Sequence, residues 1–372
     1  MQFRQPVWLM PMALIPWSGI AWADFTFNMP QGVTPISHKV YDLHMLILGI
    51  CVVIAALLYG FMFYSIFAHR KSKGAVAVQF HENTLVEVLW TVVPFLILVL
   101  MAVPATKAMI AMYDTSEADV TIKVTGYQWK WRYEYLEDGI KFVSNLKTPS
   151  EQIYKGEEKG AHYLQEVDNP LVLPVGKKVR FLITAADVLH AWWVPDFGWK
   201  QDATPGFINE GWVRIEKPGT YRGQCAELCG RGHAFMPIVV EAKSEQDYTQ
   251  WVSGQKTLLA AARDAAGKTF TKDELMAEGR KVYNANCAAC HQADGQGVPG
   301  AFPPLAGSPI AMGPLDPHLD IVLRGKAGTA MLPYEGQLDD VKLAAVITYE
   351  RNAFGNATGD LVQPARIKAA RK

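Results

Sequence analysis

Residues 225–236 read CAELCGRGHAFM and gather two thiols, an imidazole and a thioether in one short segment. Sulfur and imidazole are soft ligands that favour copper or zinc. A single blue-copper ion needs only one cysteine, so a second cysteine four residues after the first indicates a pair of copper ions bridged by both sulfurs. The candidate ligands are His190, Cys225, the carbonyl of Glu227, Cys229, His233 and Met236.

Two other interpretations of this segment remain open at the level of sequence. A tetrahedral zinc site would take Cys225, Cys229, His233 and His190, but it leaves Met236 without a role. A disulfide between the two cysteines would suit an oxidising compartment, but it leaves both histidines without a role.

The segment closes a region rich in short β-type runs. Residues 127–135 read YQWKWRYEY, with an aromatic residue at every odd position and a polar one at every even position. Such alternation predicts a half-buried strand. Further runs, punctuated by Pro and Gly, predict an antiparallel sandwich or barrel over residues 114–243. These runs are residues 171–175, 178–184, 211–216 and 237–241.

Two charge-free stretches, residues 45–68 and 88–106, precede the β region and are long enough to cross a membrane as helices. The sequence between them, HRKSK at residues 69–73, is basic and indicates the cytoplasmic side. We therefore expect a two-helix hairpin within residues 24–113, with helices over about 41–68 and 85–112 and both ends outside. Residues 1–23 are apolar and end in Ala-Trp-Ala, which predicts a signal peptide; the alternative is a third membrane helix.

Composition limits the classes of function. The 372 residues carry 36 Lys plus Arg and 36 Asp plus Glu, so the formal net charge is zero and nucleic acid is not an expected partner. A mean hydropathy of +0.04 excludes a polytopic transporter, because membrane segments must be few.

Residues 287–291 read CAACH, the signature of covalent haem c attachment through Cys287 and Cys290, with His291 as the iron ligand. Helices are predicted over residues 273–284 and 339–352, in an all-α unit at residues 269–360. Met331 is the preferred sixth ligand and Met312 the alternative. Residues 244–268 are expected to be a short helical or flexible linker, and the basic tail 361–372 is expected to be solvated and frayed.

The chain also resembles known families. The spans EVDN (166–169), VLHAWWVP (188–195) and CAELCGRGHAFM (225–236), behind a two-helix hairpin, resemble subunit II of haem-copper cytochrome c oxidase, which carries a binuclear copper (CuA) centre in a cupredoxin domain. Residues 269–355 resemble class I cytochrome c. Quinol oxidase subunits lack this ligand set, so the resemblance disfavours a quinol donor.

The resemblance implies roles for three more side chains. Trp129 would take up electrons from the docked donor, and Glu87 would lie at the mouth of a proton-uptake channel. The side chain of Glu227 would bind a magnesium ion shared with subunit I. Lys130 and Arg132 flank Trp129, so the acidic docking surface expected for a basic cytochrome is not evident there, and the fused haem domain is a candidate to replace it.

Together these features predict a multidomain membrane protein that serves as subunit II of a proton-pumping cytochrome c oxidase. Electrons from cytochrome c would pass through haem c and the copper pair to the oxygen-reducing subunit I. The expected partners are subunit I, the other oxidase subunits, cytochrome c and membrane lipid. The expected location is a bacterial inner membrane, crossed twice, with the N-terminus and both large domains on the periplasmic side.

The alternative is a stand-alone membrane-anchored electron carrier, or a copper-insertion protein, that serves another acceptor. A reductase of its own, resembling nitrous oxide reductase, is weaker because that family's catalytic cluster needs more histidines than the nine present.

Overall fold

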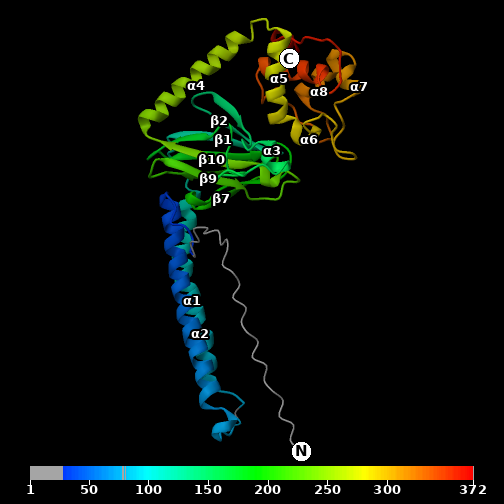
Figure 1. Ribbon diagram of the computed structural model, residues 1–372. Helices are drawn as coiled ribbons and strands as arrows, with labels where there is room; N and C mark the ends of the chain where they lie inside the picture. The colour runs from blue at the N-terminus through cyan, green and yellow to red at the C-terminus, as the bar shows by residue number, and fades with distance from the viewer. Residues whose placement is uncertain (1–27, 78, 80, 372) are drawn as a thin grey trace, which may run out of the picture.

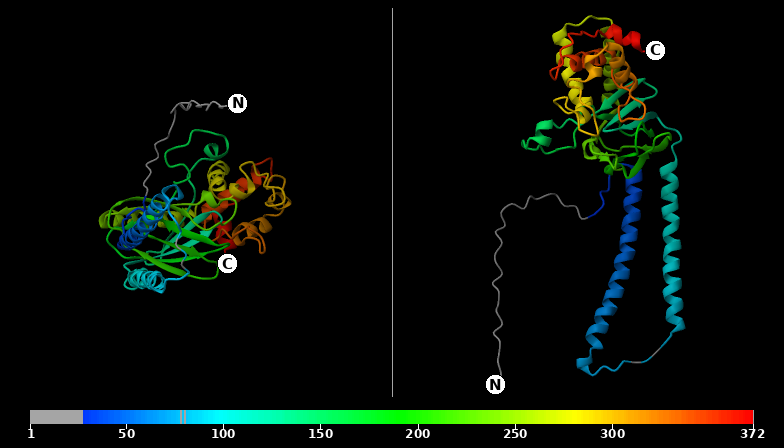
Figure 2. Two further views of the ribbon diagram at one scale, coloured as in Figure 1. Left: turned by 90° about the horizontal axis from the view of Figure 1, so that it is seen from below. Right: turned by 90° about the vertical axis from the view of Figure 1, so that its right-hand side faces the viewer.

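The computed structural model describes residues 28–371 apart from 78 and 80, so the predicted signal peptide at 1–23 lies outside the described residues. Helices α1 (Pro35–Ala68) and α2 (Thr84–Tyr113) run antiparallel and extend away from the β domain, with the short helix η1 (Lys71–Lys73) at the far turn (Figures 1 and 2). Each exceeds the roughly 20 residues needed to cross a bilayer, and their apolar side chains are largely exposed.

The membrane-proximal ends of both helices are fixed to the β domain. Helix α1 begins earlier than expected because Thr34 caps it and also donates through Oγ1 to the carbonyl of Phe197 at 2.9 Å. At the end of α2, Trp212 Nε1 donates to the carbonyl of Ala111 at 3.0 Å. The basic turn therefore lies at the end of the hairpin farthest from the β domain (Figure 2).

The β domain consists of two five-stranded sheets, ordered β3-β2-β1-β5-β8 and β4-β10-β9-β6-β7. The predicted antiparallel pairing holds for most strand pairs, but β1 pairs in parallel with β5 and β4 in parallel with β10. In each pair the chain visits other strands between the two partners, which permits parallel pairing. The strands are β1 (Val120–Tyr127), β2 (Lys130–Tyr135), β3 (Ile140–Ser144), β4 (Leu171–Pro174), β5 (Val179–Ala185), β6 (His190–Val194), β7 (Trp199–Ala203), β8 (Asn209–Val213), β9 (Gly219–Cys225) and β10 (Pro237–Lys243).

The prediction of one strand over residues 127–135 is wrong: this stretch contains the end of β1, a hairpin turn and all of β2. Tyr127 pairs with Lys130, and the two residues between them form the turn. Trp131 and Tyr133 on β2 are fully buried, as the alternation predicts. A two-residue turn preserves the odd and even spacing of the sequence while it reverses the chain, so periodicity alone does not reveal it.

The segment after the β domain is a single helix, α4 (Glu245–Ala265), and not a flexible linker. Its first half packs on the β domain, where the ring centroids of Trp251 and Tyr135 lie 5.1 Å apart. Lys256 Nζ also forms an ion pair with Asp138 at 2.7 Å. Helix α4 leads away from the sheets toward the C-terminal domain, which returns over the β1–β2 hairpin (Figure 1). The short helices of the β domain are α3 (Ser150–Tyr154), η2 (Pro195–Phe197) and η3 (His233–Phe235).

The C-terminal domain is helical, as predicted. Helices α5 and α9 cross so closely that a Cβ at Gly279 would lie 2.2 Å from the carbonyl oxygen of Ala345. The prediction of a frayed tail is wrong. The tail forms helix α10, and Ile367 is fully buried against α9. The helices are α5 (Lys272–Asn286), α6 (Ala288–His291), α7 (Pro309–Met312), α8 (Leu315–Arg324), α9 (Asp340–Asn352) and α10 (Pro364–Ala370).

Candidate metal and haem sites

The ligand loop, residues 225–236, joins the end of β9 to the start of β10. His190 is the first residue of the neighbouring strand β6, which pairs with β9 through Trp192 and Cys225. The sheet therefore brings a histidine from a distant part of the sequence against the cysteines of the loop. Cys225, Cys229 and His190 are all buried.

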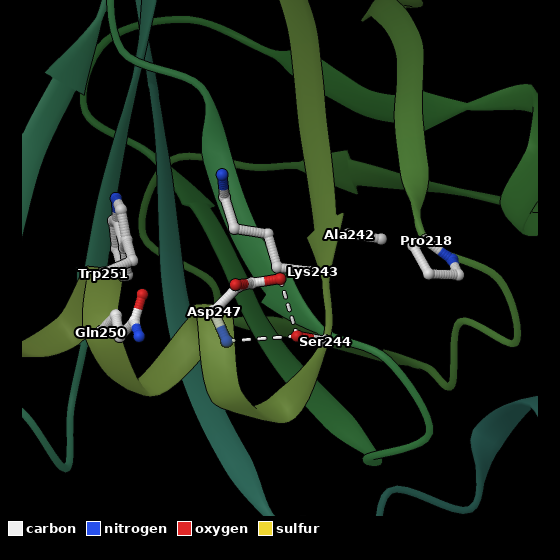
Figure 3. Close-up of a pocket in the computed structure, with 7 residues that line it drawn as sticks. All are labelled: Pro218, Ala242, Lys243, Ser244, Asp247, Gln250 and Trp251. Carbon is white, nitrogen blue, oxygen red and sulfur yellow. Dashed lines mark hydrogen bonds between the residues drawn. The ribbon is translucent and has the colours of Figure 1, made fainter.

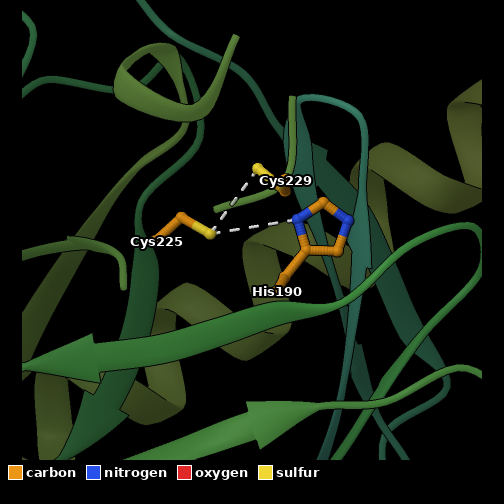
Figure 4. Close-up of side chains that lie close together, drawn as sticks. All are labelled: His190, Cys225 and Cys229. Carbon is orange, nitrogen blue, oxygen red and sulfur yellow. Dashed lines mark hydrogen bonds between the residues drawn. The ribbon is translucent and has the colours of Figure 1, made fainter. Parts of the chain in front are cut away.

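Each of the six predicted copper donors lies within 3.9 Å of another donor of the set, and Figure 4 draws three of them. The two sulfurs Cys225 Sγ and Cys229 Sγ are 3.9 Å apart, and neither cysteine is in a disulfide. Each sulfur has its own imidazole: His190 Nδ1 lies 3.9 Å from Cys225 Sγ, and His233 Nδ1 lies 3.5 Å from Cys229 Sγ. Each sulfur also has a third neighbour, because the carbonyl of Glu227 is 3.3 Å from Cys225 Sγ and Met236 Sδ is 3.5 Å from Cys229 Sγ.

This donor set fits two soft metal ions better than one. A tetrahedral zinc ion would use two sulfurs and two imidazoles and would leave the buried Met236 sulfur idle. Two copper ions that share both sulfurs would each find one imidazole and one weaker ligand, and the paired thiolates would offset much of the metal charge.

Asp187, which the sequence analysis missed, orients His190. Its Oδ1 lies 2.8 Å from His190 Nε2, and its Oδ2 accepts a hydrogen bond from the backbone N–H of Gln128 at 2.7 Å. Because the carboxylate holds the hydrogen on Nε2, the other ring nitrogen faces Cys225 and is free for a metal. Burial lowers the pKa of His190, but hydrogen bonds with Asp187 and Cys225 outweigh burial and raise it.

The Cys225 and Cys229 sulfurs lie within hydrogen-bond distance of each other, and their pKa values shift in opposite directions. The hydrogen bond with Cys229 lowers the pKa of Cys225, and the same bond raises the pKa of Cys229. Metal binding needs both sulfurs as thiolates, so it must release any proton that the Cys229 thiol holds.

Trp129 lies at the tip of the β1–β2 hairpin, directly on the ligand loop. Its Nε1 donates to the carbonyl of Cys229 at 3.1 Å, and the side chain of Gln128 donates to the same oxygen at 2.9 Å. A Cβ at Gly232 would lie 2.2 Å from the indole ring, so only glycine permits this close approach. The ring therefore packs against the loop that carries the predicted ligands, and it is partly exposed.

The two predicted glutamates occupy different ends of the molecule. The Glu227 side chain is partly exposed beside Cys225. Glu87 lies in the first turn of α2, at the end of the hairpin far from the β domain (Figure 2), where its Oε1 accepts from the N–H of Asn83 at 3.4 Å. Through this contact Glu87 helps to cap helix α2, which is a structural role independent of any role in proton uptake.

The predicted haem attachment residues lie at the α5–α6 junction. His291 Nδ1 is 2.8 Å from the carbonyl of Pro303, which fixes the ring and leaves Nε2 for the iron. Met331 lies in the loop between α8 and α9. Tyr334, in the same loop, donates through Oη to the carbonyl of Asn286 at 2.9 Å and so connects this loop to the attachment segment. Met312, the alternative ligand, ends helix α7 and is 47% exposed. The residues present therefore fit a covalent haem.

A surface hollow where α4 begins lies apart from these residues (Figure 3). Ser244 Oγ accepts from the N–H of Asp247 at 3.2 Å and donates to its carboxylate at 2.7 Å, so the polar groups there cap the helix. The lining residues are Pro218, Ala242, Lys243, Ser244, Asp247, Gln250 and Trp251.

Comparisons with known proteins agree with this arrangement. The family models for the transmembrane and periplasmic domains of cytochrome c oxidase subunit II match residues 22–108 and 120–243. The "Probable cytochrome c oxidase subunit 2" of Rickettsia prowazekii is 40% identical over 235 residues, which are 63% of this chain and 72% of that protein. The chain belongs to the cytochrome c oxidase subunit II family. The family model for cytochrome c oxidase, cbb3-type, subunit III matches residues 274–349, so this subunit II carries a fused C-terminal cytochrome c domain.

Other relatives extend the match. The cytochrome c oxidase subunit 2 of Arabidopsis thaliana is 38% identical over 227 residues, which are 60% of this chain and 87% of that protein. The crystal structure of the periplasmic domain of subunit II of cytochrome oxidase from Bradyrhizobium japonicum is 40% identical, with a TM-score of 0.35, and the match covers 38% of this chain and 97% of that one. As a member of the subunit II family, the chain is a two-pass membrane subunit of an oxidoreductase complex that transfers electrons, and the family implies copper and haem and further oxidase subunits.

Proposed function

We propose that this subunit II relays electrons from a cytochrome c to the oxygen-reducing subunit I of a proton-pumping oxidase. When bound, a covalent haem c and a binuclear copper centre supply the one-electron redox chemistry of the relay. The observation that carries the proposal is the pairing of each thiol, Cys225 and Cys229, with its own imidazole at 3.9 and 3.5 Å.

Six donors would hold the copper pair. Both ions would share Cys225 and Cys229, and the remaining donors, His190, His233, Met236 and the Glu227 carbonyl, would complete their coordination. Burial of four donors would keep water from most of the site and fix the ligand positions, so that little rearrangement would accompany a change of redox state. These four are Cys225, Cys229, His190 and Met236. The Glu227 side chain remains a candidate ligand for magnesium at the boundary with subunit I.

In the C-terminal domain, Cys287 and Cys290 would anchor the haem, and His291 and Met331 would be its axial ligands. A methionine ligand raises the reduction potential relative to a second histidine, which suits a donor to copper. Trp129 is proposed as the point of electron entry to the copper pair, on the strength of its hydrogen bond to the Cys229 carbonyl at 3.1 Å.

The orientation follows from charge. Arg70, Lys71 and Lys73 lie at the turn farthest from the β domain, and basic turns stay in the cytoplasm, so both large domains would face the periplasm of a bacterial inner membrane. Glu87 would then face the cytoplasm, where protons are taken up. The exposed apolar faces of α1 and α2 would contact lipid and subunit I.

Metal and haem analysis of the purified oxidase tests the cofactors. We expect two copper ions on this subunit with one unpaired electron shared between both nuclei in the paramagnetic resonance spectrum, and a pyridine haemochrome of haem c. Cys229→Ser should abolish the shared-spin signal, whereas Cys51→Ser, in membrane helix α1, should retain it. Zinc, or a mononuclear copper signal, would contradict the proposal.

Rapid mixing with reduced cytochrome c tests the direction of electron flow. His291→Ala should slow electron entry to the copper pair, whereas His162→Ala, an exposed histidine of the β domain, should not. Unaltered entry in His291→Ala would contradict the relay. Detergent extraction that yields this chain without a large membrane partner would instead favour the stand-alone carrier.

A further inference from the structure

The polar face of strand β2 lies against the C-terminal domain. Lys130, at the start of this strand, is only 5% exposed. Its Nζ donates to Asn286 Oδ1 at 3.3 Å and lies 4.5 Å from the centroid of the Tyr334 ring. Two residues along the strand, a guanidinium nitrogen of Arg132 would lie 3.2 Å from a Cβ at Gly336. Lys130 and Arg132 therefore face the C-terminal domain and not bulk water.

The partners of Lys130 belong to the two segments that supply the predicted haem ligands. Asn286 directly precedes Cys287, and Tyr334 follows Met331 in the loop before α9. The hydrogen bond from Tyr334 Oη to the carbonyl of Asn286 joins these segments. One side chain of the β domain thus contacts the haem site at the point where its two segments meet.

On its other side, Lys130 is one residue from the copper ligand loop. Trp129 precedes it and donates to the carbonyl of Cys229 at 3.1 Å. Two hydrogen bonds and the covalent bonds of Trp129, Lys130 and Asn286 therefore connect Cys229 to Cys287. This connection crosses the boundary between the domains.

The burial of Lys130 costs free energy. Desolvation lowers the pKa of its ammonium to about 8, although Cys287, Cys290, Asp187 and Asp168 oppose this shift. Within the described part of the chain no carboxylate forms an ion pair with Lys130; its contacts are an amide oxygen and an aromatic ring. A different docking that covered the ammonium without these contacts would be more costly still. The Lys130 side chain therefore contributes less to the stability of domain docking than to the choice of one orientation of the two domains.

We propose that Lys130 is a positioning residue for electron transfer between the haem and copper sites: it admits one docked orientation of the C-terminal domain and places a positive charge beside the haem. This inference rests on the proposed function, because it requires both cofactors. It assigns to strand β2 the role of fixing the relative orientation of the two domains, which none of the predicted metal or haem ligands performs.

The test uses the full-length oxidase and the variant Lys130→Met, which preserves an unbranched side chain without charge. Light-driven injection of one electron into the haem should show transfer to copper slowed about tenfold or more and spread over several phases, because misoriented dockings lengthen the route. The haem midpoint potential should fall, because a positive charge nearby stabilises the reduced haem. Hydrogen exchange of residues 333–337 should speed up, a readout that needs no activity.

Two matched variants separate charge from general damage. Lys130→Arg should preserve the higher potential, since it keeps the charge. Lys141→Met, on the exposed part of β3, should match the wild type in rate, potential and exchange.

The outcomes separate this inference from the proposed function. If wild-type protein holds both cofactors and Lys130→Met leaves the transfer rate and the potential unchanged, Lys130 has no positioning role. A lowered potential with an unchanged rate would likewise overturn the positioning role. If the wild type lacks the haem or the copper pair, the proposed function fails first.

Discussion

The indole nitrogen of Trp129 donates a hydrogen bond to the carbonyl oxygen of Cys229 at 3.1 Å. A side chain from the tip of one hairpin thereby contacts the backbone of a predicted copper ligand in another sheet. The contact links the partly exposed ring to the ligand loop by a hydrogen bond, which core packing alone would not require.

Trp129→Phe should remove this hydrogen bond and keep the ring on Gly232. We expect a loss of about 1 kcal/mol in the free energy of unfolding, an unchanged copper spectrum, and slower electron entry to the copper site. Trp212→Phe is the matched control, because it also loses one indole hydrogen bond to a carbonyl, that of Ala111. Equal electron-transfer rates in the two variants would show that Trp129 is only a packing residue.

Asp187→Asn should weaken copper binding through His190. The amide keeps the shape but loses the charge that fixes the imidazole tautomer, so we expect copper affinity to fall about 10- to 100-fold. Competition with a chelator of known affinity measures this change. Asp202→Asn, an exposed aspartate on β7, should have the affinity of the wild type, and a similar loss in both variants would exclude a specific role for Asp187.

The ligand loop could be predicted from the sequence because four of its donors are close together in the chain. Cys225, Cys229, His233 and Met236 all lie in the segment that connects β9 to β10. Asp187 could not, since a lone aspartate three residues before a histidine carries no distinctive signal. Its role depends on the fold of the β5–β6 loop, which places the carboxylate behind the His190 ring.

Other differences between prediction and structure have a common cause, which is contact between distant segments. The tail that ends at residue 372 is basic, so composition indicates solvation, yet Ile367 is buried against α9. Residues 244–268 are compatible with a helical or a flexible linker, and helix α4 forms there because Trp251 packs against Tyr135 and Phe142 of the β domain. The sequence pattern predicts that Lys130 faces solvent, but in the structure the C-terminal domain covers it.

Ile367→Ala tests the structural role of the tail. Because Ile367 is fully buried, we expect the C-terminal domain to lose about 2–5 kcal/mol of stability. Lys368→Ala, an exposed neighbour on the same helix, should change stability by less than about 0.5 kcal/mol. Thermal unfolding followed by haem absorption measures both variants. Indistinguishable unfolding curves would mean that α10 does not support the domain.

The burial of Lys130 between the domains predicts a pH-dependent haem potential. Its pKa is lowered to about 8, chiefly by desolvation. Reduction of the haem adds a negative charge nearby, so the pKa of Lys130 must be higher in the reduced protein than in the oxidised one. Between these two values reduction takes up a proton, so the midpoint potential should fall as the pH rises through this range.

The neighbours of Lys130 keep this assignment specific. Asp187 and Asp168 raise its pKa through their charge, and Cys287 and Cys290 carry no charge once they are thioethers. Burial raises the pKa of Tyr334, so its phenol does not titrate near pH 8. A spectroelectrochemical titration should therefore show the slope in the wild type and in Lys141→Met and a flat line in Lys130→Met. A slope that persists in Lys130→Met would assign the proton to another group, and the charge beside the haem would not be that of Lys130.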